Sequence, residues 1–379
     1  MAGIYLHIPF CTRKCHYCNF FSLASRRHFD LFPDVLIREL SQQRHYLGEQ
    51  EVDTIYFGGG TPSLLSPSSI EKILDEIRHS FRLAPEAEIT LESNPDELSP
   101  EKLKGFKNAG INRLSIGIQS FHFSDLRYLN RTHSAGQAMA AVEASFQCGF
   151  TNLGIDLIYG IPGLTAEGWA QNLETAFSLG LQHISAYALT VEPHTALEVR
   201  IRKGLSAEVV EDAVADHFRQ LMRKMREQGY LHYEISNFCR PGFESRHNSN
   251  YWSGASYLGA GPSAHSYNGH SRRWNVSTLG SWLSKISAGE ICYEEERLSP
   301  VQKHNEYVMT SLRTMQGCDT GRIATAFGES IASDFRKHAS RYVDSGNMAV
   351  RENVYFLTDE GKLFADGISA ALFAGEDAF

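Results

Sequence analysis

The chain has 379 residues, of which 42% are hydrophobic and 21% are charged. Both fractions are near those of ordinary globular proteins and argue against a wholly disordered, collagen-like or coiled-coil chain. The 36 basic and 44 acidic residues leave a formal net charge of −8 at pH 7. A general electrostatic attraction to nucleic acid or to anionic lipid is therefore not expected. The length predicts about two to three domains.

The N-terminal apolar run is about six residues long and soon reaches Arg13 and Lys14. Such a run is too short for the core of a signal peptide or for a membrane span. We therefore expect a cytoplasmic protein without a membrane span. Three of the seven cysteines, Cys11, Cys15 and Cys18, lie within eight residues. In a reducing compartment, such a group favours a metal site over a disulfide framework.

Short apolar, β-branched runs recur along the first half of the chain, and most are followed by a stretch with helical spacing of its apolar residues. Alternating strands and helices predict a parallel sheet, open or closed into a barrel. The six expected strands cover residues 3–8, 52–57, 87–92, 111–118, 151–158 and 182–189.

Polar or glycine-rich residues stand at the ends of five of these strands. They are Cys11, the run Gly58 to Thr61, Glu92, Gln119 and Asp156. The carboxyl ends of parallel strands meet at one edge of a sheet, which is where ligands bind in α/β proteins. Each residue alone is equally well explained as ordinary loop chemistry. Five at equivalent positions favour a binding site at this edge.

We expect three parts along the chain. Residues 1–240 form the barrel core, residues 241–298 a connecting segment, and residues 299–379 a C-terminal domain that resembles a winged helix. In that last part, two short β-like runs flank an Arg-Glu-Asn turn and a short helix follows. Winged helices often bind DNA, but the negative charge and the lack of a basic recognition helix argue against nucleic acid as a partner.

The spacing of Cys11, Cys15 and Cys18 is the strongest chemical signal in the sequence. A structural zinc site would need a fourth ligand, which His7 or His16 could supply. However, His16 directly follows Cys15 and would tend to point away, and no second Cys/His pair appears downstream. Three thiolates on a compact loop instead suit a [4Fe-4S] cluster in which one iron stays open to another ligand.

A C-x-x-x-C-x-x-C motif after the first strand and GGGTPS after the second resemble the radical S-adenosylmethionine (SAM) superfamily. Members of that superfamily fold as partial or full (β/α) barrels. The resemblance implies that the amine and carboxylate of SAM ligate the open iron and that the reduced cluster cleaves SAM to a 5′-deoxyadenosyl radical. The expected fold class is therefore α/β, a partial (β/α) radical SAM barrel with a winged-helix-like C-terminal domain.

Within the superfamily, the chain is similar over nearly its whole length to oxygen-independent coproporphyrinogen III oxidase and its relatives. The similar segments include IYLHIPFCTRKCHYCNF, YFGGGTPSLL, ESNPDEL, LSIGIQSF and IDLIYGIPG. Backbone N–H groups of the glycine-rich run are expected to approach a small zwitterion, because glycine has no side chain in the way. Carried over residue by residue, the cofactor contacts fall at Tyr5, Tyr17, Gly59, Gly60, Thr61, Glu92, Gln119, Arg131, Asp156 and Ala188.

Two departures distinguish the chain from the oxidases. Phe20 stands where the oxidases carry a further cysteine, and the first strand begins at residue 3, without their long N-terminal extension. Both features resemble the heme chaperones of the HemW type. That resemblance implies heme as the ligand and acceptor hemoproteins, respiratory cytochromes among the candidates, as partners; a homodimer is a candidate assembly. A heme carrier is thus favoured over an enzyme, and the oxidase stays the alternative.

The motif HNSNYW over residues 247–252 is typical of the same branch. It offers an imidazole beside aromatic surface, as a heme site requires. The competing interpretation is a packed, hydrogen-bonded corner, which is the commoner state of such residues. The heme contacts expected from the resemblance are His247, Asn248, Tyr251 and Trp252, with His265 a weaker candidate. The other cysteines, expected to be buried small hydrophobes, are Cys148, Cys239, Cys292 and Cys318.

Overall fold

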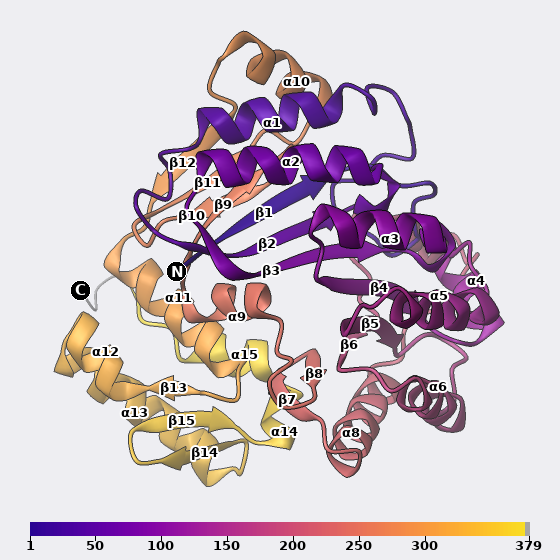
Figure 1. Ribbon diagram of the computed structural model, residues 1–379. Coiled ribbons are helices and arrows are strands. Elements are labelled where there is room, and N and C mark those ends of the chain that lie inside the picture. The colour runs from indigo at the N-terminus through magenta and orange to yellow at the C-terminus, as the bar shows by residue number, and fades with distance from the viewer. Residues whose placement is uncertain (376–379) are drawn as a thin grey trace.

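The computed structural model describes residues 1–375 and is dominated by one curved sheet of twelve strands (Figure 1). The strand order is β12-β11-β10-β9-β1-β2-β3-β4-β5-β6-β8-β7, so the sheet is open rather than closed on itself. The strands β1 to β6 are parallel, which confirms the expected α/β partial barrel. Their bounds are β1 Ala2–Ile8, β2 Val52–Gly59, β3 Leu83–Ser93, β4 Arg113–Gln119, β5 Asn152–Tyr159 and β6 His183–Ala188.

Helices connect the parallel strands and cover the outer face of the sheet, where Figure 1 shows α1, α2 and α3 side by side. Serine or threonine caps open four of them, and proline follows the cap in α2 and α3. The helices of this half are α1 Phe32–Gln42, α2 Pro67–Ser80, α3 Pro100–Ala109, α4 Phe123–Leu129, α5 Ala135–Gln147 and α6 Ala166–Ser178. Two short 3-10 helices, η1 Pro62–Leu64 and η2 Pro95–Glu97, follow β2 and β3.

The sheet continues on both sides of the parallel strands. β9 (Ser256–Ala260) runs parallel to β1, and β10 (His265–Tyr267), β11 (Ser271–Asn275) and β12 (Tyr293–Arg297) follow in antiparallel order. At the other end, β8 (Asn237–Cys239) and β7 (Leu231–Glu234) extend β6. The sheet therefore crosses the predicted boundary at residue 240. The helices here are α7 Ala196–Arg202, α8 Glu211–Glu227, α9 Arg246–Ser253 and α10 Leu279–Ala288.

Residues 300–375, which we call the C-terminal module, have a hydrophobic core of their own and a separate three-stranded sheet. The expected hairpin is confirmed, with Glu352 of the Arg-Glu-Asn turn in the left-handed region at φ 56°. The winged-helix likeness stays a prediction. The elements are α11 Pro300–Leu312, β13 Cys318–Asp319, α12 Thr320–Phe327, α13 Glu329–Asp344, β14 Met348–Arg351, β15 Val354–Leu357, α14 Asp359–Lys362 and α15 Ala365–Ala371.

No helix within residues 1–375 combines the length and the apolar composition that crossing a bilayer requires. Of the scattered cysteines, Cys239, Cys292 and Cys318 are buried as expected. Cys148 is half-buried, so its prediction is wrong. The reason is its position at the C-cap of α5, where the chain leaves the helix and its thiol lies 3.7 Å from the Pro100 carbonyl oxygen.

A buried carboxylate on α1 forms hydrogen bonds to the segments around β9 to β12. Glu39 of α1 is fully buried and accepts hydrogen bonds from the Gly261 N–H at 2.7 Å and the Trp282 indole N–H at 2.9 Å. The Asn275 amide donates to its other oxygen at 2.6 Å, and the Cys292 thiol lies 3.6 Å from that oxygen. Burial raises the pKa of Glu39, while these hydrogen bonds act in the opposite direction. The segments around β9 to β12 are thus attached to α1 through the single carboxylate of Glu39.

We expect Glu39→Gln to lower the free energy of unfolding by about 1–3 kcal/mol, because the new amide group turns a donor toward buried donors and leaves at least one of them without an acceptor. Urea denaturation followed by circular dichroism measures this change. The exposed Glu49 offers a matched control, since Glu49→Gln should leave the unfolding midpoint unchanged. Equal midpoints for wild type and Glu39→Gln would contradict the role given to Glu39.

Candidate functional site

The loop between β1 and α1, residues 9–31, carries the three clustered cysteines, and we call it the cysteine loop. Cys11, Cys15 and Cys18 are free, half-buried thiols. The Cys11 N–H donates to the Leu23 carbonyl at 3.0 Å within the loop, and the Thr61 N–H donates to the Phe10 carbonyl at 2.7 Å, which holds the loop to the end of β2. The thiols therefore lie over the carboxyl ends of β1 and β2.

Of the two histidines near the cysteine loop, His7 has both ring nitrogens engaged, whereas His16 has a partner at Nδ1 only. The His7 ring contacts the Phe21 carbonyl oxygen at 2.8 Å and the Tyr5 hydroxyl at 3.0 Å, and Nδ1 of His16 contacts the Tyr128 carbonyl oxygen at 3.0 Å. Within residues 1–375, no three His, Cys, Asp or Glu side chains converge on one point. The [4Fe-4S] cluster therefore stays a prediction from the sequence.

Arg131 is the cation beside the cysteine loop. Its guanidinium lies 3.4 Å from Sγ of Cys15 and donates to Oδ1 of Asn94 at 2.6 Å. Asn94 in turn donates to Oγ1 of Thr61 at 3.1 Å. Nε of Arg131 is buried and has no partner among the described residues. Asn94 was not among the predicted contacts, although it lies in the segment ESNPDEL that carried the resemblance.

The glycines that end β2 are required for packing rather than for ligand space. Gly59 has a φ of +112°, and a Cβ there would lie 2.8 Å from the His7 ring. A Cβ on Gly60 would lie 2.5 Å from the Phe10 carbonyl oxygen and 3.0 Å from Sγ of Cys11. A side chain at Gly59 would therefore collide with His7 of β1, so packing already requires glycine at this position. Gly60 is the glycine that leaves room beside a cysteine.

The backbone N–H groups of this run also differ from the expectation. The Gly59 N–H donates to the Glu92 carboxylate at 3.1 Å, the Gly60 N–H donates to the Ile8 carbonyl at 2.8 Å, and the Thr61 N–H is taken by Phe10. All three donors have acceptors inside the protein. A zwitterion at this edge must therefore be recognised mainly by side chains.

Glu92 on β3 is the carboxylate closest in the structure to these glycines. It accepts hydrogen bonds from the Tyr56 hydroxyl at 2.7 Å and from the Gly59 N–H. Burial raises the pKa of Glu92 to about 7; the hydrogen bond from Tyr56 opposes this rise and the charge of Asp156 adds to it. Near neutral pH this carboxyl group can therefore both donate and accept a hydrogen bond.

The remaining predicted cofactor contacts lie along the same strands. Gln119 ends β4 with a φ of 70° and is buried. Asp156 lies on β5 and accepts from the Ser115 hydroxyl at 3.2 Å; burial raises its pKa. Ala188 ends β6, and Tyr17 packs from the cysteine loop against the core. Tyr5 lies farther back in β1, stacked on Tyr56 with 6.2 Å between ring centroids.

Helix α9 brings the HNSNYW motif to the opposite end of the barrel. Nδ1 of His247 lies 2.9 Å from the Thr54 hydroxyl near the start of β2, and Nε2 lies 3.0 Å from the Tyr251 hydroxyl. The ring is only 1% exposed, and burial lowers its pKa to about 3. A Cβ on Gly3, near the start of β1, would lie 3.2 Å from it. With both nitrogens engaged, His247 matches the packed, hydrogen-bonded corner better than a heme ligand.

The other predicted heme contacts lie in different surroundings from His247. The Asn248 N–H donates to the Ser245 hydroxyl at 3.4 Å as part of the cap of α9. Tyr251 and Trp252 line a cavity between α9 and the C-terminal module. His265 is exposed at the start of β10 and does not line that cavity. The motif therefore has a buried half and a half that faces a cavity.

The fold and the cysteine loop can be compared with known proteins. Residues 5–176 match the family model of the Radical SAM superfamily. The solved coproporphyrinogen III oxidase (HemN) of Escherichia coli, described as a radical SAM enzyme, superposes with a TM-score of 0.86 at 24% identity, over 98% of this chain and 90% of that one. At this identity the likeness shows the fold. The class is thus a radical SAM protein with a partial (β/α) barrel.

Proteins with similar sequences identify the family within this class. The heme chaperone HemW of Mycobacterium tuberculosis (strain CDC 1551 / Oshkosh) is 36% identical over 375 residues, covering 98% of this chain and 94% of that protein. The heme chaperone HemW of Bacillus subtilis (strain 168) is 34% identical over 379 residues, covering 99% of this chain and 100% of that protein. The chain belongs to the HemW family.

The raised pKa of Glu92 makes stability depend on pH. The folded chain keeps this proton up to a pKa of about 7, while the ordinary glutamate pKa of 4.5 applies to the unfolded chain. Between these values the folded state binds more protons, so stability falls as pH rises. From pH 5.5 to pH 7.5, the free energy of unfolding of wild type should fall by roughly 1–2 kcal/mol more than that of Glu92→Gln.

Urea unfolding at the two pH values, without added SAM and with the same iron content in both proteins, measures this difference. Glu71→Gln, at an exposed position of α2, is the control and should keep the wild-type pH dependence. Parallel pH profiles for wild type and Glu92→Gln would show that Glu92 is not the titrating group.

Proposed function

We propose that the chain binds heme and delivers it to acceptor hemoproteins, on a scaffold that carries a [4Fe-4S] cluster and SAM. The observation that carries the proposal is the near full-length likeness to proteins that are themselves named heme chaperones. The cysteine loop, the strand-end carboxylates and Arg131 support the cofactor part. The aromatic half of the HNSNYW motif supports the heme part.

Cys11, Cys15 and Cys18 would hold the cluster. Their thiols are free, and Gly60 leaves room beside Cys11. Arg131 places a positive charge 3.4 Å from Cys15, which offsets the negative charge of thiolates. When bound and reduced, such a cluster supplies one electron to the sulfonium of SAM.

The polar side chains at the same edge would hold SAM. Arg131 can pair with a carboxylate, and its buried Nε still lacks a partner among the described residues. Glu92 and Asp156 can accept hydrogen bonds from an ammonium group or from ribose hydroxyls. Hydrogen bonds from the Tyr56 and Ser115 hydroxyls fix the positions of these carboxyl groups.

The alternative, oxidative decarboxylation of coproporphyrinogen III, meets an obstacle at Phe20. Its side chain is 65% exposed, so the position at which the oxidases carry a further cysteine holds a phenyl ring in solvent. A radical intermediate must be shielded from water and from side reactions. A loop with an open apolar side chain suits a surface that meets another molecule better than an enclosed reaction chamber.

The cluster part predicts about four irons and four sulfides per chain after anaerobic reconstitution. Replacing Cys11, Cys15 or Cys18 by Ala should remove the broad charge-transfer absorption and most of the iron, because three ligands are the minimum for holding the cluster. Iron analysis and visible spectra measure the loss. Cys148→Ala is the control, since Cys148 is half-buried far along the chain, after α5. If one of these three variants kept its full iron content, the replaced cysteine would not be a cluster ligand.

The heme part predicts that heme added to the reconstituted protein gives a saturable Soret band at about one heme per chain. The same protein incubated with coproporphyrinogen III, SAM and a reductant should release neither carbon dioxide nor protoporphyrinogen, because Phe20 stands in place of the further cysteine of the oxidases. Spectral titration and product analysis measure the two outcomes. Steady decarboxylation would assign the chain to the oxidase alternative instead.

A further inference from the structure

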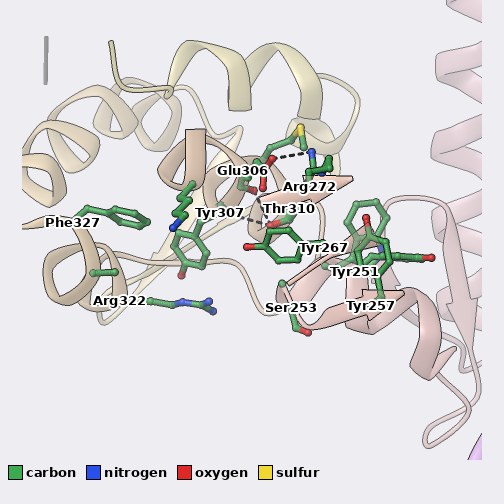
Figure 2. A pocket seen from close by; sticks show the side chains of 15 residues that line it. Tyr251, Ser253, Tyr257, Tyr267, Arg272, Glu306, Tyr307, Thr310, Arg322 and Phe327 are labelled. Atoms are coloured by element: carbon green, nitrogen blue, oxygen red, sulfur yellow. Dashed lines mark hydrogen bonds and ion pairs between the residues drawn. The ribbon is translucent and has the colours of Figure 1, made fainter. Parts of the chain in front are cut away.

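A cavity of about 330 Å³ lies where α9 and the strands β9 to β11 face the helices α11 and α12 of the C-terminal module (Figure 2). Its size is within the range of small-ligand sites. Aromatic rings from five of these elements form much of its wall. They are Tyr251, Trp252, Tyr257, Tyr267, Tyr307 and Phe327.

The rings provide flat surfaces in different orientations. Tyr251 and Tyr257 meet edge to face, with 4.6 Å between centroids and 88° between planes, and Tyr267 lies 6.3 Å beyond Tyr257. In Figure 2 these three rings stand on one side of the cavity, while Tyr307 lies on the side of the C-terminal module. A flat aromatic ligand can therefore contact both sides at once.

The cavity also carries positive charge in a chain whose formal net charge is −8. Arg272 is neutralised by Glu306, at 2.9 Å. Lys303 and Arg322 line the cavity and form no ion pair with a carboxylate within residues 1–375; the Arg322 guanidinium lies 4.5 Å from the centre of the Tyr307 ring. Two cations without counter-charges beside aromatic walls indicate a ligand that is flat and carries carboxylates or phosphates.

We infer that this cavity is the heme site, with the macrocycle against the tyrosine rings and the propionate carboxylates paired with Lys303 and Arg322. The inference rests on the proposed function and names its site. Nucleotides also combine a flat ring with anionic groups, and their binding is an outcome of the test below. The family likeness favours the tetrapyrrole.

This location gives the buried histidine of the motif a role. Nε2 of His247 lies 3.0 Å from the Tyr251 hydroxyl, and the Tyr251 ring meets Tyr257 in the cavity wall. His247 is therefore a positioning residue: it fixes the orientation of a wall residue and does not contact the ligand. Trp252, the last residue of the motif, also lines the cavity, and its buried indole N–H has no partner among the described residues.

The test is a heme titration of reconstituted wild type and of the double variant Lys303→Ala/Arg322→Ala. Loss of both carboxylate partners should weaken heme binding about tenfold or more. Binding of iron-free protoporphyrin IX should weaken to a similar degree, because the two cations recognise the propionates and not the iron. Heme dimethyl ester, which lacks free carboxylates, should bind both proteins alike. Lys104→Ala/Arg44→Ala removes two exposed cations elsewhere and should bind heme as wild type does.

The outcomes distinguish the location of the heme site from the heme-binding function itself. Heme binding by wild type that is unchanged in the double variant would overturn the location and leave the proposed function standing. Absence of heme binding by wild type would overturn both. ATP binding that depends on Lys303 and Arg322, with heme binding unaffected by them, would make the cavity a nucleotide site. Circular dichroism spectra and unfolding midpoints of the variants show whether a loss of binding reflects a loss of fold.

Discussion

The parallel register of β1 to β6 is the constraint on which both ends of this barrel depend. Ile8 pairs with Gly59, and Glu92 pairs with Ser115, so strand ends that are far apart in sequence meet at one edge. The cysteine loop, Gly60 and Arg131 lie together only because of that pairing. A shift of one residue in a strand would turn its inward side chains outward. The same register places the starts of the strands at the other edge, under α9.

The core of the fold could be predicted from sequence because buried parallel strands are continuous apolar runs and their connecting helices are amphipathic. The added strands could not. β12 reads YEEER and is mostly exposed, so it has no apolar signature, and β9 joins the sheet beside β1 through pairing across most of the chain. The strand-end residues were predictable by position. Their partners were not, because the hydrogen bond from Gly59 to Glu92 and the bridging role of Asn94 arise only after folding.

Packed rings and hydrogen bonds connect the two ends of the barrel through its interior. Tyr56 donates to Glu92 at 2.7 Å on one side and stacks on His247 on the other, with 5.0 Å between ring centroids. His247 then contacts Tyr251, which lines the cavity beneath α9. The barrel is thus filled by a continuous column of rings and hydrogen bonds.

β1 pairs with β9, a strand that the ribosome synthesises much later. β1 is made first, yet Ala2 pairs with Ser256, which emerges 254 residues later. At about 5–20 residues per second, one edge of β1 stays unpaired for roughly 10–50 s. During that interval the cysteine loop is attached to an incomplete sheet. The same open edge is a template for aggregation, so the nascent chain depends on prompt translation of its second half.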